Sequence, residues 1–169
     1  MQMIKGRAYK FGDGINTDVI YPGRYLSITT DREEMAKHCF ETVYPEFLKT
    51  ARAGDIIVGG KNFGCGSSRE QAATCLKYFG IGAVVAESFA RIFYRNAINL
   101  GLPVLVAPGV TRVVDHGDDI EIDLDRGMVK NTRTNETVES TRLPSFILEI
   151  INDGGLIKHL RKKLGLSNK

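Results

Sequence analysis

Residues 55–86 read DIIVGGKNFGCGSSREQAATCLKYFGIGAVVA, and this stretch decides the fold class. A short apolar run rich in β-branched residues opens it, a glycine-rich loop follows, and a second apolar run closes it. Between the loop and the second run, the apolar spacing from Ala72 to Phe79 predicts a helix that ends at Gly80, because glycine commonly closes helices in the left-handed conformation. Strand, loop, helix and strand in this order predict a parallel α/β unit.

The same alternation continues on both sides of this unit. Residues 3–12 and 103–108 have the composition of strands, and residues 89–100 have helical spacing with Gly101 directly after them. Beyond Pro108 the character changes, because DIEIDLD alternates apolar and charged residues as a half-exposed antiparallel strand does. We therefore expect an α/β fold whose mixed sheet has a parallel middle and an antiparallel β portion.

Two glycines divide the C-terminal part of the chain, where residues 143–165 predict two helices separated by Gly154 and Gly155. The length of 169 residues suits one hydrophobic core, so we expect residues 1–169 to form a single domain.

Helix starts are marked by serine or threonine followed three residues later by glutamate, the pattern of a capping box. Thr30 with Glu33 and Ser67 with Glu70 have this form, and Ser88 precedes the helical segment after the second strand. The pattern predicts that these three hydroxyls cap helices that begin directly after them.

Charge and hydropathy exclude several classes of function. Lys and Arg number 23 against 20 Asp and Glu, and a net charge of +3, spread evenly except at residues 159–163, gives little support for nucleic acid binding. That basic stretch fits a solvated helix end better than a polyanion site. The sequence has no apolar stretch near the roughly 20 residues that span a bilayer, and no signal-peptide core. We expect a cytoplasmic protein that binds neither nucleic acid nor membrane.

Cysteine usage limits the cofactors that this chain could bind. Cys39, Cys65 and Cys75 are an odd number without a CxxC pair, which fits reduced thiols rather than disulfides or a zinc site. Three cysteines so scattered are not a complete iron–sulfur ligand set. Cys65 lies between two glycines, where it either fills a tight turn or could approach a cluster or an oxidant.

The loop NFGCGSSRE at 62–70 is the strongest candidate for chemistry. The N-terminus of a helix favours an anion, and Arg69 offers a planar, permanently charged fork for a carboxylate. The same environment would stabilise a deprotonated Ser67 and allow it to act as a base. The alternative is that Ser67 only caps the helix, at about 1 kcal/mol. The GxxxxGK[ST] pattern of phosphate-binding loops is missing here.

Three segments in order resemble a known family: NTDVIYPGRYL at 16–26, GGKNFGCGSSRE at 59–70 and ESFARIFYRNAINLGLP at 87–103. They are similar to the small subunits of isopropylmalate dehydratase and homoaconitase, in the aconitase superfamily. The resemblance implies a swivelling β/β/α domain like the C-terminal domain of aconitase. It also implies a separate large subunit that carries a [4Fe–4S] cluster, so that no cluster is bound by this chain.

The resemblance also assigns roles to residues. It implies that Ser67 removes a proton from carbon, that Ser68 and Arg69 bind a substrate carboxylate, and that Asp18 lies in the active site. For Asp18 the alternative is a residue that only forms a turn. Arg91 and Arg95, one helical turn apart, are either ion-pairing groups for the partner subunit or solvated side chains.

Substrate choice in this family depends on the residues after a Tyr–Leu pair, and Ser27 follows that pair here. Homoaconitase-like members have an arginine that binds an additional carboxylate, and its absence disfavours a tricarboxylate. A second departure is Gln71, where many relatives have histidine, and we expect it to change a hydrogen bond and not the reaction.

The expected function is therefore that of a hydro-lyase small subunit, active only with its large subunit, which isomerises 2-isopropylmalate to 3-isopropylmalate through isopropylmaleate in leucine biosynthesis. The alternatives are a homoaconitase or another alkylmalate or citraconate-type hydratase subunit, and a non-catalytic module that binds a dicarboxylate. Whether the isolated chain forms a homo-oligomer stays open.

Overall fold

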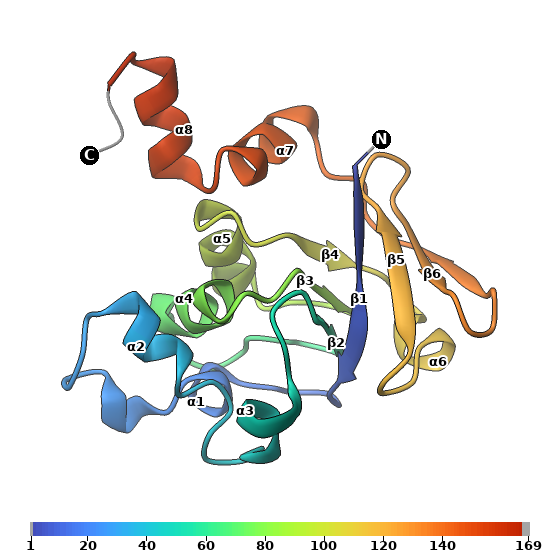
Figure 1. The fold of residues 1–169 in the computed structure, drawn as a ribbon, viewed down its shortest axis with the longest axis horizontal. Helices are drawn as coiled ribbons and strands as arrows, with labels where there is room; N and C mark the ends of the chain where they lie inside the picture. The colour runs from blue at the N-terminus through green and yellow to red at the C-terminus, as the bar shows by residue number, and fades with distance from the viewer. Residues whose placement is uncertain (1, 167–169) are drawn as a thin grey trace.

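The protein is built on a seven-stranded mixed sheet in the order β4-β3-β2-β1-β5-β6-β7 (Figure 1). The structure is a computed structural model and describes residues 2–166. Strands β1 to β4 are parallel, and β5, β6 and β7 continue the sheet antiparallel from β1. The strands are β1 (Met3–Lys10), β2 (Ile56–Gly59), β3 (Ala83–Ala86), β4 (Val104–Val106), β5 (Asp119–Asp123), β6 (Met128–Asn131) and β7 (Thr137–Glu139).

The parallel strands form the centre of the hydrophobic core. Every residue of β2 and β3 is buried, and Ile57 lies beside Val84 in the ladder between them. Strands buried on both faces read as continuous apolar runs, as the sequence does here. In β5 the exposed Asp119 is followed by the buried Ile120, so this strand has the half-exposed pattern predicted for it. The predicted fold class, a mixed α/β sheet with an antiparallel portion, is confirmed.

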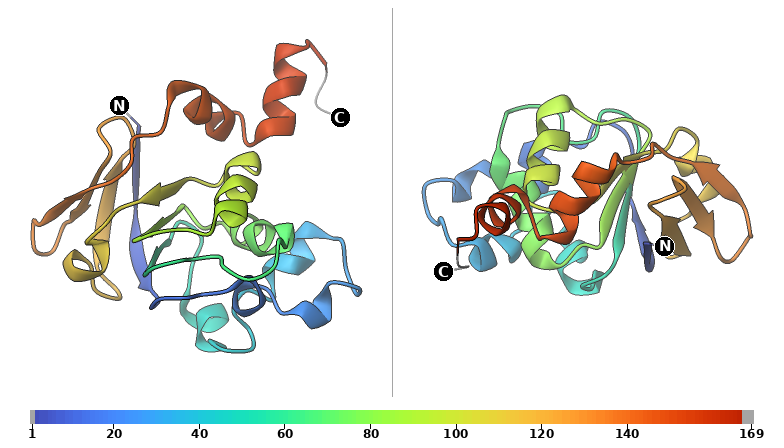
Figure 2. Two further views of the ribbon diagram at one scale, coloured as in Figure 1. Left: turned by 180° about the vertical axis from the view of Figure 1, so that it is seen from behind. Right: turned by 90° about the horizontal axis from the view of Figure 1, so that it is seen from above.

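Helices cover both faces of the parallel strands. Figures 1 and 2 show α2, α4 and α5 on one side of them, while α6 contacts β2, β3 and β7 from the other side. Within residues 2–166, no helix is long and apolar enough to cross a membrane. The helices are α1 (Thr17–Ile20), a 3-10 turn η1 (Gly23–Tyr25), α2 (Arg32–Ala36), α3 (Glu46–Thr50), α4 (Glu70–Phe79), α5 (Arg91–Asn99), α6 (Val110–Val113), α7 (Ser145–Asn152) and α8 (Leu156–Lys163).

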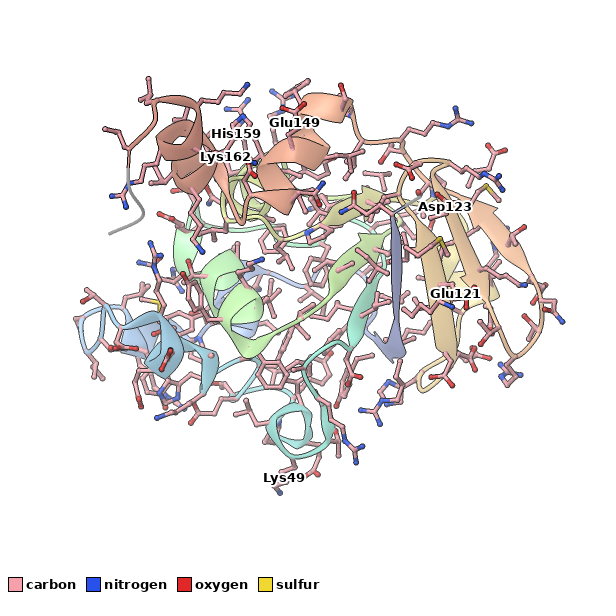
Figure 3. All side chains as sticks on the ribbon, turned by 45° about the horizontal axis from the view of Figure 1, so that its top comes forward. Lys49, Glu121, Asp123, Glu149, His159 and Lys162 are labelled. Atoms are coloured by element: carbon pink, nitrogen blue, oxygen red, sulfur yellow. The ribbon has the colours of Figure 1, made fainter. Side chains whose placement is uncertain are left out.

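The last two helices lie at one end of the molecule, next to α5. His159 of α8 is buried, and its Nδ1 lies 2.7 Å from Oδ2 of Asp153, whose other oxygen accepts a hydrogen bond from Lys162. Figure 3 labels His159 and Lys162 on this helix. The predicted glycine break between the two helices is confirmed, because Gly154 and Gly155 separate them with positive φ.

The predicted helix caps are wrong at all three starts. Helix α2 begins at Arg32 with Asp31 as its cap, and α4 and α5 begin after Arg69 and Ala90, whose side chains make no capping bond. The predicted end of α4 is confirmed, since Gly80 has a φ of 98° there.

The serine hydroxyls are used for contacts between loops instead of capping. The Ser88 hydroxyl accepts a hydrogen bond from the Asn62 N–H at 2.8 Å, and the Ser67 hydroxyl contacts Thr17. Local spacing cannot reveal such contacts, because their partners lie far away in the sequence.

Candidate active site

The loops that follow β1, β2 and β3 meet at the carboxyl ends of these strands. The Gly64 N–H donates to the Ile15 carbonyl at 2.7 Å, which joins the second loop to the first. The Ala90 N–H donates to the Phe63 carbonyl at 2.9 Å, which joins the third loop to the second. In parallel sheets this edge is the usual place for a ligand site, and here it carries the loop with Ser67.

Gly64 is required by both the backbone conformation and the packing of this loop. Its φ is +80°, and a Cβ built on it would lie 2.2 Å from Cγ of Phe93, which is buried in α5. We expect Gly64→Ala to lower the free energy of unfolding by about 2–4 kcal/mol, from left-handed strain and overpacking together. Thermal or urea unfolding of the chain measures this.

Two other glycines provide the controls for that prediction. Gly14 also has a positive φ but nothing within 4 Å of its Cβ position, so Gly14→Ala isolates the backbone strain. Gly12 has open space and no positive φ, so Gly12→Ala should change the unfolding free energy by less than about 0.5 kcal/mol. Equal losses at all three positions would contradict the packing role of Gly64.

Ser67 lies exposed at the end of the glycine-rich loop, just before α4. Its Oγ is 3.1 Å from Oγ1 of Thr17, and the Thr17 hydroxyl is also 3.2 Å from the Ser67 carbonyl oxygen. Thr17 itself is only 2% exposed. Ser67 is therefore not a helix cap, and its hydroxyl is held by a buried neighbour while it remains open to solvent.

Arg69 and Asp18 form an ion pair beside this serine. The Arg69 Nη1 donates to Oδ1 of Asp18 at 2.7 Å, and the Gly23 N–H donates to the same oxygen at 2.8 Å. These two bonds hold the pKa of the Asp18 carboxyl below its usual range, so that it stays ionised at neutral pH. Asp18 is 66% exposed and Arg69 is 27% exposed, so both can be reached from the surface.

The start of α4 adds a field that favours an anion. Helix α4 has ten residues, and Ser67, Ser68 and Arg69 directly precede it. The N–H groups of a first helical turn lack partners within the helix and form the positive end of its dipole. Together with the guanidinium group, this arrangement can bind a carboxylate next to the Ser67 hydroxyl.

The sequence-predicted residues fall into two groups. The structure brings Asp18, Ser67 and Arg69 together, with Ser68 between the last two. Ser27 is exposed on the neighbouring segment, four residues after Gly23. The Gly23 N–H bonds to Asp18, and a Cβ built on Gly23 would lie 3.0 Å from Nη1 of Arg69. The sequence reasoning missed Thr17 as a site residue, and its only signal there was its place directly before Asp18.

The cysteines are not arranged to bind an iron–sulfur cluster. Cys39 and Cys75 are completely buried in the core, and Cys65 is a partly exposed free thiol in the glycine-rich loop. Among residues 2–166 there is no group of three or more His, Cys, Asp or Glu side chains that could hold a metal ion. A cluster therefore does not fit the residues that the structure describes in this chain.

Known proteins resemble this chain over nearly all of its length. The Aconitase C-terminal domain family model matches residues 12–108. The 3-isopropylmalate dehydratase small subunit of Aquifex aeolicus is 51% identical over 97% of this chain and 98% of its own. The isopropylmalate/citramalate isomerase small subunit of Methanocaldococcus jannaschii is 51% identical over 98% of both chains.

A solved structure agrees with these sequence relatives. The crystal structure of 3-isopropylmalate dehydratase from Methanocaldococcus jannaschii superposes with a TM-score of 0.90 at 49% identity, over 96% of each chain. The resemblance noted in the sequence is thus confirmed in sequence and in fold. The chain belongs to the aconitase C-terminal domain family and, within it, to the small subunits of 3-isopropylmalate dehydratase.

Proposed function

We propose that this chain, together with a large subunit that carries a [4Fe–4S] cluster, interconverts 2-isopropylmalate and 3-isopropylmalate through isopropylmaleate in leucine biosynthesis. The observation that carries the proposal is the exposed Ser67 hydroxyl, held by Thr17 and placed between the start of α4 and the Asp18–Arg69 pair. The relatives with the corresponding names, about half identical over nearly the whole chain, support the choice of reaction.

In this proposal Ser67 is the base of the dehydration. Its deprotonated oxygen takes a proton from the methylene carbon of 2-isopropylmalate, and the hydroxyl leaves the neighbouring carbon with a proton supplied from the large subunit's side of the site. Isopropylmaleate, water and a protonated Ser67 result. Returning the proton and the hydroxyl to the opposite carbons gives 3-isopropylmalate. The positive end of α4 favours the deprotonated serine. In this scheme the Thr17 hydroxyl turns its one proton from the Ser67 carbonyl, 3.2 Å away, to the Ser67 oxygen, 3.1 Å away, when the serine is deprotonated.

Arg69 and Ser68 bind a substrate carboxylate in the same scheme. The Asp18 carboxylate holds Nη1 of Arg69, which leaves the other nitrogen atoms of the guanidinium group to donate to the substrate. Asp18 thereby fixes the orientation of the Arg69 guanidinium group. The hydrogen bond from the Gly23 N–H in turn holds the Asp18 carboxylate in place.

The large subunit completes the site. Ser67, Ser68 and Asp18 all lie open to solvent, whereas elimination of water is favoured where solvent is excluded. The groups that assist departure of the hydroxyl belong to that subunit in this proposal. We place the complex in the cytoplasm, where the free thiols Cys39, Cys65 and Cys75 would stay reduced.

Ser27 supports an alkyl-bearing substrate over a tricarboxylate. It is exposed, and the next residue, Ile28, is 70% exposed, so these two residues offer an uncharged and partly apolar surface. A tricarboxylate would need a cation there, since a carboxylate without a partner is strongly disfavoured once water is excluded.

Reconstitution tests the proposal. The chain is mixed with the cluster-bearing large subunit from the same genome, and 2-isopropylmalate, homocitrate and citramalate are offered as separate substrates. The ultraviolet absorbance of the unsaturated acid that each substrate gives is followed. We expect the highest kcat/KM with 2-isopropylmalate. Preference for homocitrate would favour a homoaconitase, and binding of a dicarboxylate without turnover would favour a non-catalytic module.

Thr17 supplies a specific prediction for this mechanism. Thr17→Val keeps the shape of the side chain and removes the hydroxyl that lies 3.1 Å from Ser67 Oγ. We expect kcat to fall about tenfold, because loss of one hydrogen bond of about 1.4 kcal/mol raises the activation free energy by that amount. Thr17→Ser, which keeps the hydroxyl, should retain most of the rate, and equal rates for the valine and serine variants would contradict the role of this contact.

A further inference from the structure

The segment after η1 starts directly at the candidate active site. The Gly23 N–H donates to Asp18, and a Cβ at Gly23 would lie 3.0 Å from Nη1 of Arg69, so the chain passes the ion pair closely. Ser27 and Ile28 follow and are both exposed. This exposed segment therefore begins within a few residues of the Asp18–Arg69 pair.

The segment of residues 26–37 lies between Tyr25 and His38. The rings of these two residues are stacked on each other. Their ring centroids are 3.7 Å apart, with 17° between the ring planes. Both rings are half-buried. The stack therefore joins the two ends of residues 26–37, which include Ser27.

Glu41 bonds to both ends of the segment at once. Its Oε1 accepts hydrogen bonds from the Tyr25 hydroxyl at 2.8 Å and from Arg24 at 3.2 Å, while its Oε2 lies 2.6 Å from Nδ1 of His38. The Arg24 guanidinium group also lies over the Tyr25 ring, 5.0 Å from its centroid. Four side chains from both ends of one segment thus form a connected network.

The returning end of the network is anchored in the core. Phe40, between His38 and Glu41, is completely buried and stacks on Phe11 with centroids 4.3 Å apart. Its N–H donates to the Ile20 carbonyl at 2.9 Å. His38 and Glu41 therefore stand on a fixed part of the fold, to which they tie Arg24 and Tyr25.

We propose that a clasp of Arg24, Tyr25, His38 and Glu41 holds residues 26–30, which precede the core-packed helix α2, in the position in which Ser27 and Ile28 face the alkyl group of the substrate. These four are positioning residues, because they act through the segment and do not contact the reacting atoms. The inference rests on the proposed function, since it concerns the specificity of the same site.

The clasp determines the fraction of molecules in which the segment has the conformation that binds substrate. When only a fraction of molecules has the competent conformation, the apparent dissociation constant rises by the inverse of that fraction. A segment released in about nine molecules of ten would raise KM about tenfold. The kcat value would change little, because Ser67 and Thr17 lie outside the clasp.

The experiment compares two Glu→Gln variants in the reconstituted two-subunit enzyme. Glu41→Gln removes the charge that joins both ends, whereas Glu34→Gln removes an exposed ion pair with Lys37 in the same segment but outside the clasp. For Glu41→Gln we expect KM for 2-isopropylmalate to rise about five- to tenfold, with kcat within about twofold. For Glu34→Gln we expect neither value to change.

Two further readouts separate positioning from a merely structural role. In Glu41→Gln, the ratio of kcat/KM for 2-isopropylmalate to kcat/KM for citramalate should fall. Citramalate has a methyl group where 2-isopropylmalate has its isopropyl group. Amide hydrogen exchange should become faster in residues 26–30 and stay unchanged in β2 and α4. Tyr25→Phe keeps the stack and loses one hydrogen bond, so its KM should lie between those of the wild type and Glu41→Gln; it also serves if Glu41→Gln fails to fold.

The clasp would be disproved if exchange became faster in residues 26–30 while KM stayed unchanged. It would also be disproved if Glu34→Gln raised KM as much as Glu41→Gln does. Failure of the proposed function looks different, because Ser67→Ala would then retain normal turnover. A complex that loses turnover with Ser67→Ala but keeps the wild-type KM with Glu41→Gln and Tyr25→Phe refutes the clasp alone.

Discussion

Replacing Ser67 by alanine is expected to lower kcat of the reconstituted enzyme about a thousandfold. The substitution removes the oxygen that would take the proton from carbon, and a positioned general base contributes roughly 10²–10⁴ in rate. Assembly and substrate binding should survive, because the Ser67 side chain is exposed and its one side-chain partner is the Thr17 hydroxyl among the described residues. Steady-state kinetics and size-exclusion chromatography of the complex measure the two effects separately.

A second serine provides the control for this variant. Ser145 is exposed at the start of α7, which packs against α5 and α8, and Ser145→Ala is the same chemical change. We expect its kcat to match the wild type. A loss of rate with Ser145→Ala as large as that with Ser67→Ala would mean that the assay reports folding or assembly and not proton transfer.

Replacing Arg69 by alanine is expected to raise KM for 2-isopropylmalate about thirty- to hundredfold. A hydrogen bond to a charged group contributes about 1.5–3 kcal/mol, and Arg69 would bind the substrate carboxylate in a bidentate manner, through two parallel hydrogen bonds. Arg69→Lys keeps the charge without the planar fork, so it should restore only part of the affinity. KM and a direct binding measurement with the two-subunit complex test this.

Substitution of Asp18 distinguishes the role of Arg69 in binding the substrate from its role in the ion pair with Asp18. Asp18→Asn weakens the same contact from the other side, because it removes the carboxylate charge that Nη1 of Arg69 meets at 2.7 Å. If Arg69 mattered only as the partner of Asp18, Asp18→Asn would raise KM as much as Arg69→Ala does. We expect a smaller rise, since the guanidinium group stays in place.

Much of the fold can be predicted from the sequence because its main elements have strong local patterns. The runs around Ile57 and Val84 could only be buried strands of a covered sheet, and Gly80 ends α4 in the predicted left-handed conformation. The short elements α1, α3, α6 and β7 were not predicted, since three to five residues carry too little periodicity.

The helix starts were mispredicted for a reason that also concerns the site. Ser67 and Ser88 have the spacing of caps, yet their hydroxyls bond to Thr17 and to Asn62, which lie 50 and 26 residues away in the sequence. A capping box is a local signal, whereas these contacts exist only because three loops converge at one edge of the sheet. The structure therefore assigns to Ser67 a contact that its sequence context did not indicate.

The members of the candidate site were selected from the sequence, but their arrangement could not be predicted from it. Family resemblance selected Asp18, Ser67 and Arg69, and the structure brings Asp18 and Arg69 into contact across 51 residues of sequence. The buried Thr17 hydroxyl and the stack of Tyr25 on His38 had no signal in composition or spacing. Both depend on tertiary packing of the loop after β1.

Hydrogen exchange at carbon tests the role of Ser67 most directly. The wild-type and Ser67→Ala complexes are incubated with 2-isopropylmalate in D₂O, and deuterium in the methylene group of the recovered substrate is measured by NMR. We predict incorporation with the wild type and its loss by about a thousandfold with Ser67→Ala, at similar substrate affinity. Incorporation at the wild-type rate in the alanine variant would contradict proton removal by Ser67.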